Sequence, residues 1–493
     1  MMRRILMICI VALGLIINSC DNYLDINQDP NSPAEGNMTS SMIFPAAEMH
    51  LSASYGYILR LTGGYYAQHY AHQFGVNNWM DASRFIMSAT RSSATYSQLT
   101  SGCLNNLEFI RKICINNEDW GTYLAATTLR AFAYQVLVDC YGEVPYKEAL
   151  NPSILSPRYD EGVIVYKGIL AELDEALGRV SGSEVVATNF LFPSATVGKW
   201  IQFANALKLR ILMRMSNVQN VHSQFVSLIA ENNFPTEDIC FANCWANESG
   251  KANPFFWEEL SLTSGTQKNV ILNIALWKTM ESAKDARLGA FFSKNSNGEY
   301  AGGVSGTNFS LSSSFPTTYW SRPTDKYNTP VYLISLAETY FFLSEYEARY
   351  GTTTKAEEFY KKAIEASFTT AGVSGFESVL EAYPWDSSNY QKVIGIQKWV
   401  ALSGINSFEA WCELRRLGYP AFGNVTGYDL TDENSYFDTT LYVPGTLYTP
   451  IACNASLGNN RVLQRFPYAE SSANRNENTP VYPGDTSPIF WAK

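Results

Sequence analysis

The feature that most constrains the fold of this chain is a series of apolar stripes at helical spacing. In the clearest stripe the apolar residues fall at offsets 0, 3, 4, 7, 8 and 11, namely Leu129, Phe132, Ala133, Val136, Leu137 and Cys140. This spacing makes one continuous face of a helix with 3.6 residues per turn, whereas a half-buried strand alternates with a period of two. Gly142 and Pro145 follow the stripe and predict the end of that helix.

Further stripes come in pairs that are separated by short links. The first pair covers residues 166–180 and 200–215. The second covers 334–351 and 354–364, where Thr354 with Glu357 three residues later has the form of a capping box. These spacings indicate pairs of helices that lie antiparallel to one another.

The length of the second pair suggests how such pairs assemble. A helix, a short turn and a second helix over about 34 residues form the unit of a tetratricopeptide-like repeat. One pair cannot bury its apolar stripe alone, so neighbouring pairs stack. With a last helical stretch expected over 391–417, we predict a mainly α fold built on a tetratricopeptide-like scaffold of helix pairs.

Between the helical segments lie long stretches with a different composition. Residues 243–265 and 298–329, and roughly the last 75 residues, are rich in Gly, Ser, Asn, Thr and aromatic side chains. Loops of this length inside a compact domain are usually either functional or disordered, and the aromatic residues here favour an ordered surface. We expect inserted loop regions at about 243–329 and 418–493 that together form an irregular binding face.

The first residues have the layout of a secretory signal. Arg3 and Arg4 precede an apolar run of thirteen residues, Ile5 to Ile17. As a helix this run would cover roughly 20 Å, which is too short for a hydrocarbon core of roughly 30 Å. Cys20 follows in a context that resembles a lipobox, so we predict a signal peptide over 1–19 and acylation of Cys20, for example by palmitate. The domain would then span 20–493 and be held at a membrane by its lipid.

Composition excludes some partners and cofactors. The formal net charge is −10 and becomes −12 without Arg3 and Arg4, which argues against a nucleic-acid partner. Seven cysteines would remain in the mature chain, and an odd number does not describe a disulfide framework. Cys140 and Cys412 fit small buried residues, while Cys240 and Cys244 are either two free thiols or a local disulfide. With four histidines and no second cysteine pair at ligand spacing, we expect no zinc site and no cofactor, and the sequence leaves a structural calcium open.

Several segments, taken in order, resemble the SusD/RagB family of outer-membrane lipoproteins. They begin after Cys20 with Tyr23-Leu24-Asp25-Ile26-Asn27 and end with a closing motif, and the blocks that follow the opening are 137–149, 200–215, 330–351, 397–420 and 461–478. The block QKWVALSGINSFEAWCELRRLGYP at 397–420 is the most specific. The resemblance therefore extends over nearly the whole mature chain.

The resemblance implies a function that is not enzymatic. Such a lipoprotein faces outward from the outer membrane, caps a SusC-like TonB-dependent transporter, captures oligomeric nutrient and delivers it to the barrel. The cargo is then a glycan, which aromatic rings and amides recognise, or a peptide. From other classes, a lipid-anchored glycoside hydrolase would need two converging carboxylates, and a pure scaffold would grip only the transporter.

Three loop segments carry the candidate ligand-binding residues. Each combines an aromatic ring, expected to be exposed, with short polar groups: Asn77, Asn78, Trp79 and Asp81 in the first, Tyr319, Trp320, Arg322 and Asp325 in the second, and Trp257, Glu258 and Glu259 in the third. Trp79 and Trp320 are the expected stacking rings, and their replacement should weaken glycan binding without a change in thermal stability.

Other polar residues favour structural roles. His69 and His72 stand three residues apart on an expected helix, but no third ligand follows at a clear spacing, so we interpret them as hydrogen-bonded residues. At helical spacing, Glu409 and Glu413 are expected to form ion pairs with Arg415 and Arg416. Glu338 and Glu345 are expected to hold loop backbone or arginines of a neighbouring helix.

Overall fold

The computed structural model describes residues 38–73, 78–193, 196–261, 269–306, 317–431 and 439–492. Cys20 and the expected signal peptide lie outside these ranges, as does Asn77, so the predictions for them stay predictions. Within the described ranges, no helix is both long and apolar enough to cross a membrane.

Helices dominate the structure, as predicted. The α-helices are α2 (Ser40–Ala53), α3 (Arg60–Tyr66), α4 (Met80–Ser83), α5 (Ala89–Ser97), α6 (Asn105–Asn117), α7 (Trp120–Tyr141), α8 (Gly162–Leu177), α9 (Val197–Met215), α10 (His222–Glu231), α11 (Ile274–Ser282), α12 (Arg287–Phe291), α13 (Leu336–Tyr350), α14 (Thr353–Ala371), α15 (Glu377–Ala382), α16 (Tyr390–Leu402), α17 (Ser407–Leu417) and α18 (Glu470–Ala473). Wider π-type turns occur at η2 (Ser54–Leu59), η3 (Gln98–Leu104) and η4 (Phe256–Leu260), and short 3₁₀ turns at η6 (Thr317–Tyr319), η7 (Ser387–Asn389) and η8 (Thr439–Leu441).

The strands of the described residues are short and form two-stranded sheets. They are β1 (Tyr70–His72), β2 (Val144–Pro145), β3 (Tyr159–Asp160), β4 (Ile239–Phe241), β5 (Val270–Leu272), β6 (Val331–Ile334), β7 (Phe422–Thr426) and β8 (Leu447–Thr449). The pairs β1–β5, β2–β3 and β4–β6 are antiparallel, and β7–β8 is parallel. Each sheet therefore joins segments that are distant in sequence or fixes a local turn.

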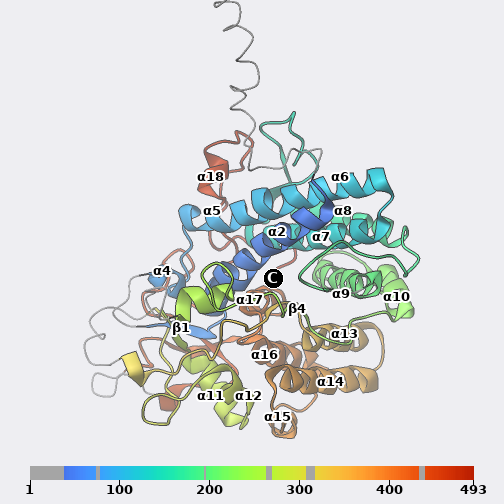
Figure 1. Ribbon diagram of the computed structural model, residues 1–493. Coiled ribbons are helices and arrows are strands. Elements are labelled where there is room, and N and C mark those ends of the chain that lie inside the picture. Colours follow the sequence, from blue (N-terminus) through green and yellow to red (C-terminus); the bar gives the residue numbers. More distant parts are fainter. Residues whose placement is uncertain are drawn as a thin grey trace, which may run out of the picture.

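The helices pack as pairs that stack on one another. α6 packs on α7, α8 on α9, α13 on α14 and α16 on α17, and α9 also contacts both α7 and α13. In Figure 1 these pairs occupy the right and lower parts of the molecule, whereas α4, β1, α11 and α12 gather on the left with most of the irregular segments. The predicted scaffold of helix pairs with an irregular face is confirmed.

Local sequence explains where many of these helices begin and end. The Ser335 side chain caps α13 by accepting a hydrogen bond from the Glu338 amide at 3.1 Å. α7 ends at Gly142, whose φ of +82° is unfavourable for other residues, so the predicted end of that helix is confirmed. Gly418 ends α17 in the same left-handed region, with φ of +77°.

Three predicted boundaries were wrong. Thr352, not Thr354, caps α14, because its side chain accepts from the Lys355 amide at 3.3 Å and the helix starts one residue later. Ile334 belongs to β6 and not to α13, because its backbone pairs with Ile239. The expected helical stretch over 391–417 is two helices, which Gly404 separates with φ of +70°.

Buried ion pairs tie the stacked helices together. On α9, Arg210 forms a two-pronged pair with Glu338 of α13, at 2.8 and 2.9 Å, and Arg214 contacts Asp139 of α7 and Glu409 of α17. All five side chains are fully buried. Glu409 therefore pairs across helices and not along its own helix as expected.

A second buried cluster joins α13 to α16 and α17. Arg416 contacts Glu345 at 2.8 and 2.5 Å and Glu413, three residues earlier on its own helix, at 2.9 and 2.6 Å. Lys398 of α16 reaches Glu413 at 3.1 Å. Burial alone would raise the pKa of Glu345, but Arg416 and Arg349 hold it below its ordinary value. The predicted roles of Glu338, Glu345, Glu413 and Arg416 are confirmed.

Removal of one partner from the buried ion pairs of Arg210 and Arg214 on α9 should lower the stability of the fold. We expect Glu338→Ala to lower the free energy of unfolding by about 3–5 kcal/mol, because it removes the two-pronged partner of buried Arg210 and leaves only Glu409 at 3.8 Å. Urea denaturation of the purified protein measures this change. The matched control is Glu357→Ala, which removes an exposed pair with Lys361 and should change stability by less than about 0.5 kcal/mol. Equal losses in the two variants would contradict the importance of the network.

Candidate functional site

The three candidate segments predicted from sequence meet in one region. β1 pairs with β5. In β5, the backbone amide of Leu272 also donates a hydrogen bond to the Ser321 carbonyl at 2.9 Å. Gln73, just after β1, donates from its backbone amide to the Asn269 carbonyl at 2.7 Å. The segments 78–81, 256–259 and 319–322 therefore surround the β1–β5 pair, on the irregular side of the molecule (Figure 1).

A hydrogen-bonded cluster connects the first and third segments. Trp79 donates from Nε1 to the Tyr57 hydroxyl at 3.2 Å, and that hydroxyl donates to Glu259 Oε1 at 3.1 Å. Asn269 donates from its amide to both carboxylate oxygens of Glu259, at 3.2 and 3.0 Å. We call Tyr57, Trp79, Glu259 and Asn269 the Glu259 cluster.

Burial controls the electrostatics of the Glu259 cluster. Glu259 is 1% exposed, and burial raises its pKa to about 7 against the opposing hydrogen bonds from Asn269 and Tyr57. Burial likewise lowers the pKa of Arg322 to about 10, although Glu259 acts in the other direction. Arg322 donates to the Val270 carbonyl at 3.1 Å and to the side chain of Gln73. The site thus holds a carboxyl group that changes charge near neutral pH beside a guanidinium.

The expected stacking rings are not exposed. Trp79 is 7% and Trp320 3% exposed, because Trp79 packs edge-on against Tyr57 beneath the Arg91 guanidinium, and Trp320 packs against Ala71, Ile271 and Ala301. Rings covered to this extent cannot offer a face to a sugar. Their expected exposure was therefore wrong, and replacement of either ring is expected to lower thermal stability.

The remaining candidates lie nearer to the surface. Asn78 and Asp81 are exposed, whereas Trp257, Tyr319 and Arg322 are half-buried. Asp325 is instead committed to the fold, because it forms a two-pronged ion pair with Arg60 at 2.8 and 2.9 Å. Direct ligand contact by the other residues stays a prediction, and the structure shows that they lie around a common region.

The two candidate histidines have structural partners, as interpreted. His69 is fully buried between the Ser407 hydroxyl, at 3.0 Å, and the Trp399 carbonyl, at 2.9 Å, and burial lowers its pKa to about 3. His72 Nε2 lies 2.7 Å from the Asn78 carbonyl. Their expected helical placement was wrong, because His69 follows α3 and His72 lies in β1.

Cysteines and metal ligands add no reactive centre to the described part of the chain. Cys240 and Cys244 are free thiols, and Cys140 and Cys412 are buried. Burial raises the pKa of each of these thiols above its ordinary value. No group of three potential metal-ligating side chains occurs among the described residues.

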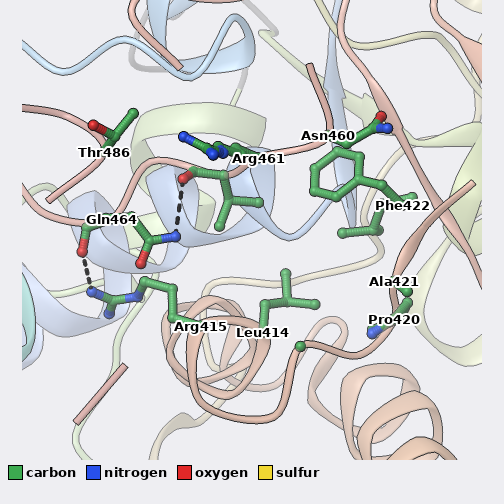
Figure 2. A pocket seen from close by; sticks show the side chains of 12 residues that line it. Leu414, Arg415, Pro420, Ala421, Phe422, Asn460, Arg461, Gln464 and Thr486 are labelled. Carbon is green, nitrogen blue, oxygen red and sulfur yellow. Dashed lines mark hydrogen bonds between the residues drawn. The ribbon is translucent and has the colours of Figure 1, made fainter. Parts of the chain in front are cut away.

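Sequence reasoning missed a pocket of about 600 Å³ at the C-terminal end of α17. Its walls come from the end of α17, the segment leading into β7, one residue of β8, and two segments near the chain end, and its lining is Leu414, Arg415, Gly418, Pro420, Ala421, Phe422, Leu447, Asn460, Arg461, Val462, Gln464 and Thr486. Figure 2 shows Arg461, Gln464 and Arg415 on one side of this pocket and Phe422 with Asn460 on the other. We call it the α17 pocket. No sequence motif joins residues 414–422 to 460–464, so only the folded chain reveals it.

Comparison with known proteins gives a family match over most of the chain. Residues 30–438 match the family model SusD-like_2, described as starch-binding and associating with the outer membrane. No curated protein sequence matches significantly.

Solved structures resemble the fold closely at low sequence identity. A structure described as a chitin-binding protein has a TM-score of 0.72 at 20% identity and covers 92% of this chain and 100% of its own. A SusD homologue from Bacteroides uniformis has a TM-score of 0.70 at 21% identity, with 91% and 99% covered. A SusD/RagB family protein from Bacteroides thetaiotaomicron has a TM-score of 0.70 at 19% identity, with 92% and 99% covered. At such identities the likeness shows a shared fold.

The raised pKa of Glu259 should appear in the pH dependence of stability. The folded protein holds the proton more tightly than the unfolded chain, so the contribution of Glu259 is present below about pH 4.5 and is lost as pH rises to about 7. Over this range we expect the free energy of unfolding of the parent to fall by on the order of 2 kcal/mol relative to that of Glu259→Gln. A constant difference in stability between the two proteins does not affect this comparison. Urea titrations at a series of pH values measure this difference, and a difference independent of pH would contradict it.

Proposed function

The chain belongs to the SusD-like family, and from that premise we propose that it is a cell-surface protein that binds glycans for nutrient uptake. The observation that carries the proposal is the match of residues 30–438 to a family described as starch-binding and associating with the outer membrane. One structural neighbour is described as a chitin-binding protein, which supports glycan as the ligand class. In this proposal the protein binds and releases its cargo and does not cleave it.

The finer proposal concerns anchorage and delivery. Acylation at Cys20 would hold the protein on the outer face of the outer membrane, and release of cargo to a SusC-like TonB-dependent transporter would complete uptake. The basic start, the apolar run and Cys20 in the sequence support the anchor. The helix-pair scaffold supports delivery, since it offers a rigid body that presents the irregular face to cargo.

We propose that glycan meets the surface around the Glu259 cluster. Half-buried Trp257 and Tyr319 replace Trp79 and Trp320 as the aromatic residues available to ligand, and exposed Asn78 and Asp81 supply polar groups for hydroxyls. The packed ring of Trp79 and the hydrogen bonds to Glu259 support this surface from beneath. Weak contacts of this kind suit a protein that must hand its cargo onward.

The proposal predicts that loss of the two accessible rings weakens binding. We expect the double variant Trp257→Ala with Tyr319→Ala to reduce retention in affinity electrophoresis with bound polysaccharide by about tenfold, because each ring contact contributes about 0.5–1.5 kcal/mol. Starch and soluble chitin derivatives are suitable polysaccharides. The matched control is Trp385→Ala with Tyr350→Ala, which removes the same ring types away from this surface.

Two results would count against the proposal. Equal retention of the double variant and its control would show that these rings do not meet the glycan. Release of shorter sugars from the polysaccharide by the purified parent protein would show an enzyme and not a binding protein.

A further inference from the structure

The α17 pocket contains positive charge that no carboxylate of the described chain neutralises. Most buried arginines of the described residues have a carboxylate partner, in the pairs Arg60–Asp325, Arg130–Glu172, Arg210–Glu338, Arg214–Asp139, Arg287–Asp285 and Arg416–Glu345. Arg415 is 2% exposed, and its guanidinium contacts the Asp139 carbonyl at 2.9 Å, the Gln464 carbonyl at 2.8 Å, the Cys412 sulfur at 3.2 Å and the Trp411 ring. The ion pair expected for Arg415 from its helical spacing is therefore absent among the described residues.

A second arginine reinforces this charge at the pocket surface. Arg461 is exposed, lines the pocket with Arg415, and forms no ion pair with any described carboxylate. None of the twelve lining residues is acidic, although the chain as a whole carries a formal charge of −10. The pocket is thus a local site of positive charge on a negatively charged protein, which favours an anionic ligand.

Neutral hydrogen-bonding groups complete the polar side of the pocket. Gln464 donates from Nε2 to the Val462 carbonyl at 3.3 Å, while its buried Oε1 accepts no hydrogen bond from the described residues. Because this oxygen is buried, Gln464 forms part of the pocket wall and does not accept from a ligand. Asn460 and Thr486 add amide and hydroxyl groups nearby (Figure 2).

The opposite side of the pocket is apolar. Phe422 is half-buried at the start of β7, and the apolar side chains of Leu414, Leu447 and Val462 also line the pocket. An aromatic ring beside neutral amides suits a sugar ring, which has apolar C–H faces and hydroxyl edges. The volume of about 600 Å³ lies within the roughly 300–1,000 Å³ of small-ligand pockets.

We propose that the α17 pocket binds an acidic sugar residue of the glycan cargo. The anionic group, a carboxylate or a sulfate ester, meets Arg461 in the field of Arg415. Sugar hydroxyls hydrogen-bond to the exposed side chains of Asn460 and Thr486, and the ring lies against Phe422. This inference rests on the proposed glycan-binding function and adds a second, charge-selective site that is distinct from the Glu259 cluster.

A peptide carboxylate fits the pocket less well. Extended peptides are recognised chiefly through unpaired backbone groups at a sheet edge. In the pocket wall, the Leu447 amide already donates to the Ala421 carbonyl at 2.9 Å. The pocket therefore offers ligands mainly side chains, which suits a compact sugar.

The test compares the affinities of the parent protein and of an arginine variant for acidic and for neutral oligosaccharides. The mature full chain is titrated calorimetrically with oligogalacturonides, with sulfated oligosaccharides of similar length, and with malto-oligosaccharides. We expect Arg461→Gln to weaken binding of the preferred acidic series at least tenfold and to leave neutral binding within twofold. Arg475→Gln is the matched control, because it removes another exposed arginine outside the pocket and should leave both affinities unchanged.

The acidic series that responds to Arg461→Gln identifies the anionic group as carboxylate or sulfate. Arg461→Lys should restore part of the affinity, since it keeps the charge but loses the planar fork. Equal acidic binding by Arg461→Gln and Arg475→Gln would overturn the inference, and so would a parent protein that binds only the neutral series. Arg461-dependent binding of peptides with a free rather than an amidated C-terminus would also overturn it. Failure to bind any oligosaccharide would instead contradict the proposed function itself.

Discussion

The stacked helices depend on two buried arginines that lie one turn apart on α9. Arg210 and Arg214 join α9 to carboxylates on α7, α13 and α17, and Trp491 near the chain end donates to the same Asp139 at 3.0 Å. Burial of an arginine without its partner would cost several kcal/mol, so the helices are fixed in one relative register and not merely in hydrophobic contact. Hydrophobic packing permits small shifts between stripes, whereas a two-pronged ion pair does not. The network thus makes the helix pairs a rigid body from which long irregular segments can extend.

That rigidity explains how short strands organise the irregular face. β1 and β5 have three residues each, too few to form a stable sheet alone. Contacts with the helices hold these strands in place. β1 follows α3, which packs on α17, and Arg60 of α3 forms an ion pair with Asp325 in the segment after Ser321. Arg322 then connects the Val270 carbonyl of β5 to Gln73 just beyond β1. Side chains more than 200 positions apart in sequence therefore share one surface without a continuous sheet beneath them.

Sequence periodicity predicted the scaffold well because each apolar stripe is local. The stripe from Leu129 to Cys140 lies within α7, and a short link after Gly351 joins α13 to α14 as expected, although Thr352 and not Thr354 caps α14. The sequence predicted only which segments form the binding face, because composition does not reveal which aromatic side chains of a loop are buried by other residues. Trp79 is buried by Tyr57 and Arg91, and neither contact has a signal at a fixed sequence spacing. The predicted ion pair of Arg415 was wrong for a related reason. Its spacing from carboxylates on α17 is suitable, but its guanidinium donates to the carbonyls of Asp139 and Gln464 instead.

The two proposed binding surfaces differ in how the charge of their buried ionisable groups is compensated. In the Glu259 cluster, burial favours the neutral carboxyl, and three hydrogen bonds from Tyr57 and Asn269 satisfy it from within the protein, so this surface is suited to uncharged hydroxyls. In the α17 pocket, Arg415 is surrounded by carbonyls and aromatic rings, which leave its positive charge uncompensated by any described carboxylate. A net charge of −10 repels an acidic polymer at a distance, but at physiological salt this repulsion is screened beyond about 8 Å. At contact the local arginines therefore determine the interaction, and a protein that is acidic overall can still select an acidic sugar at one pocket.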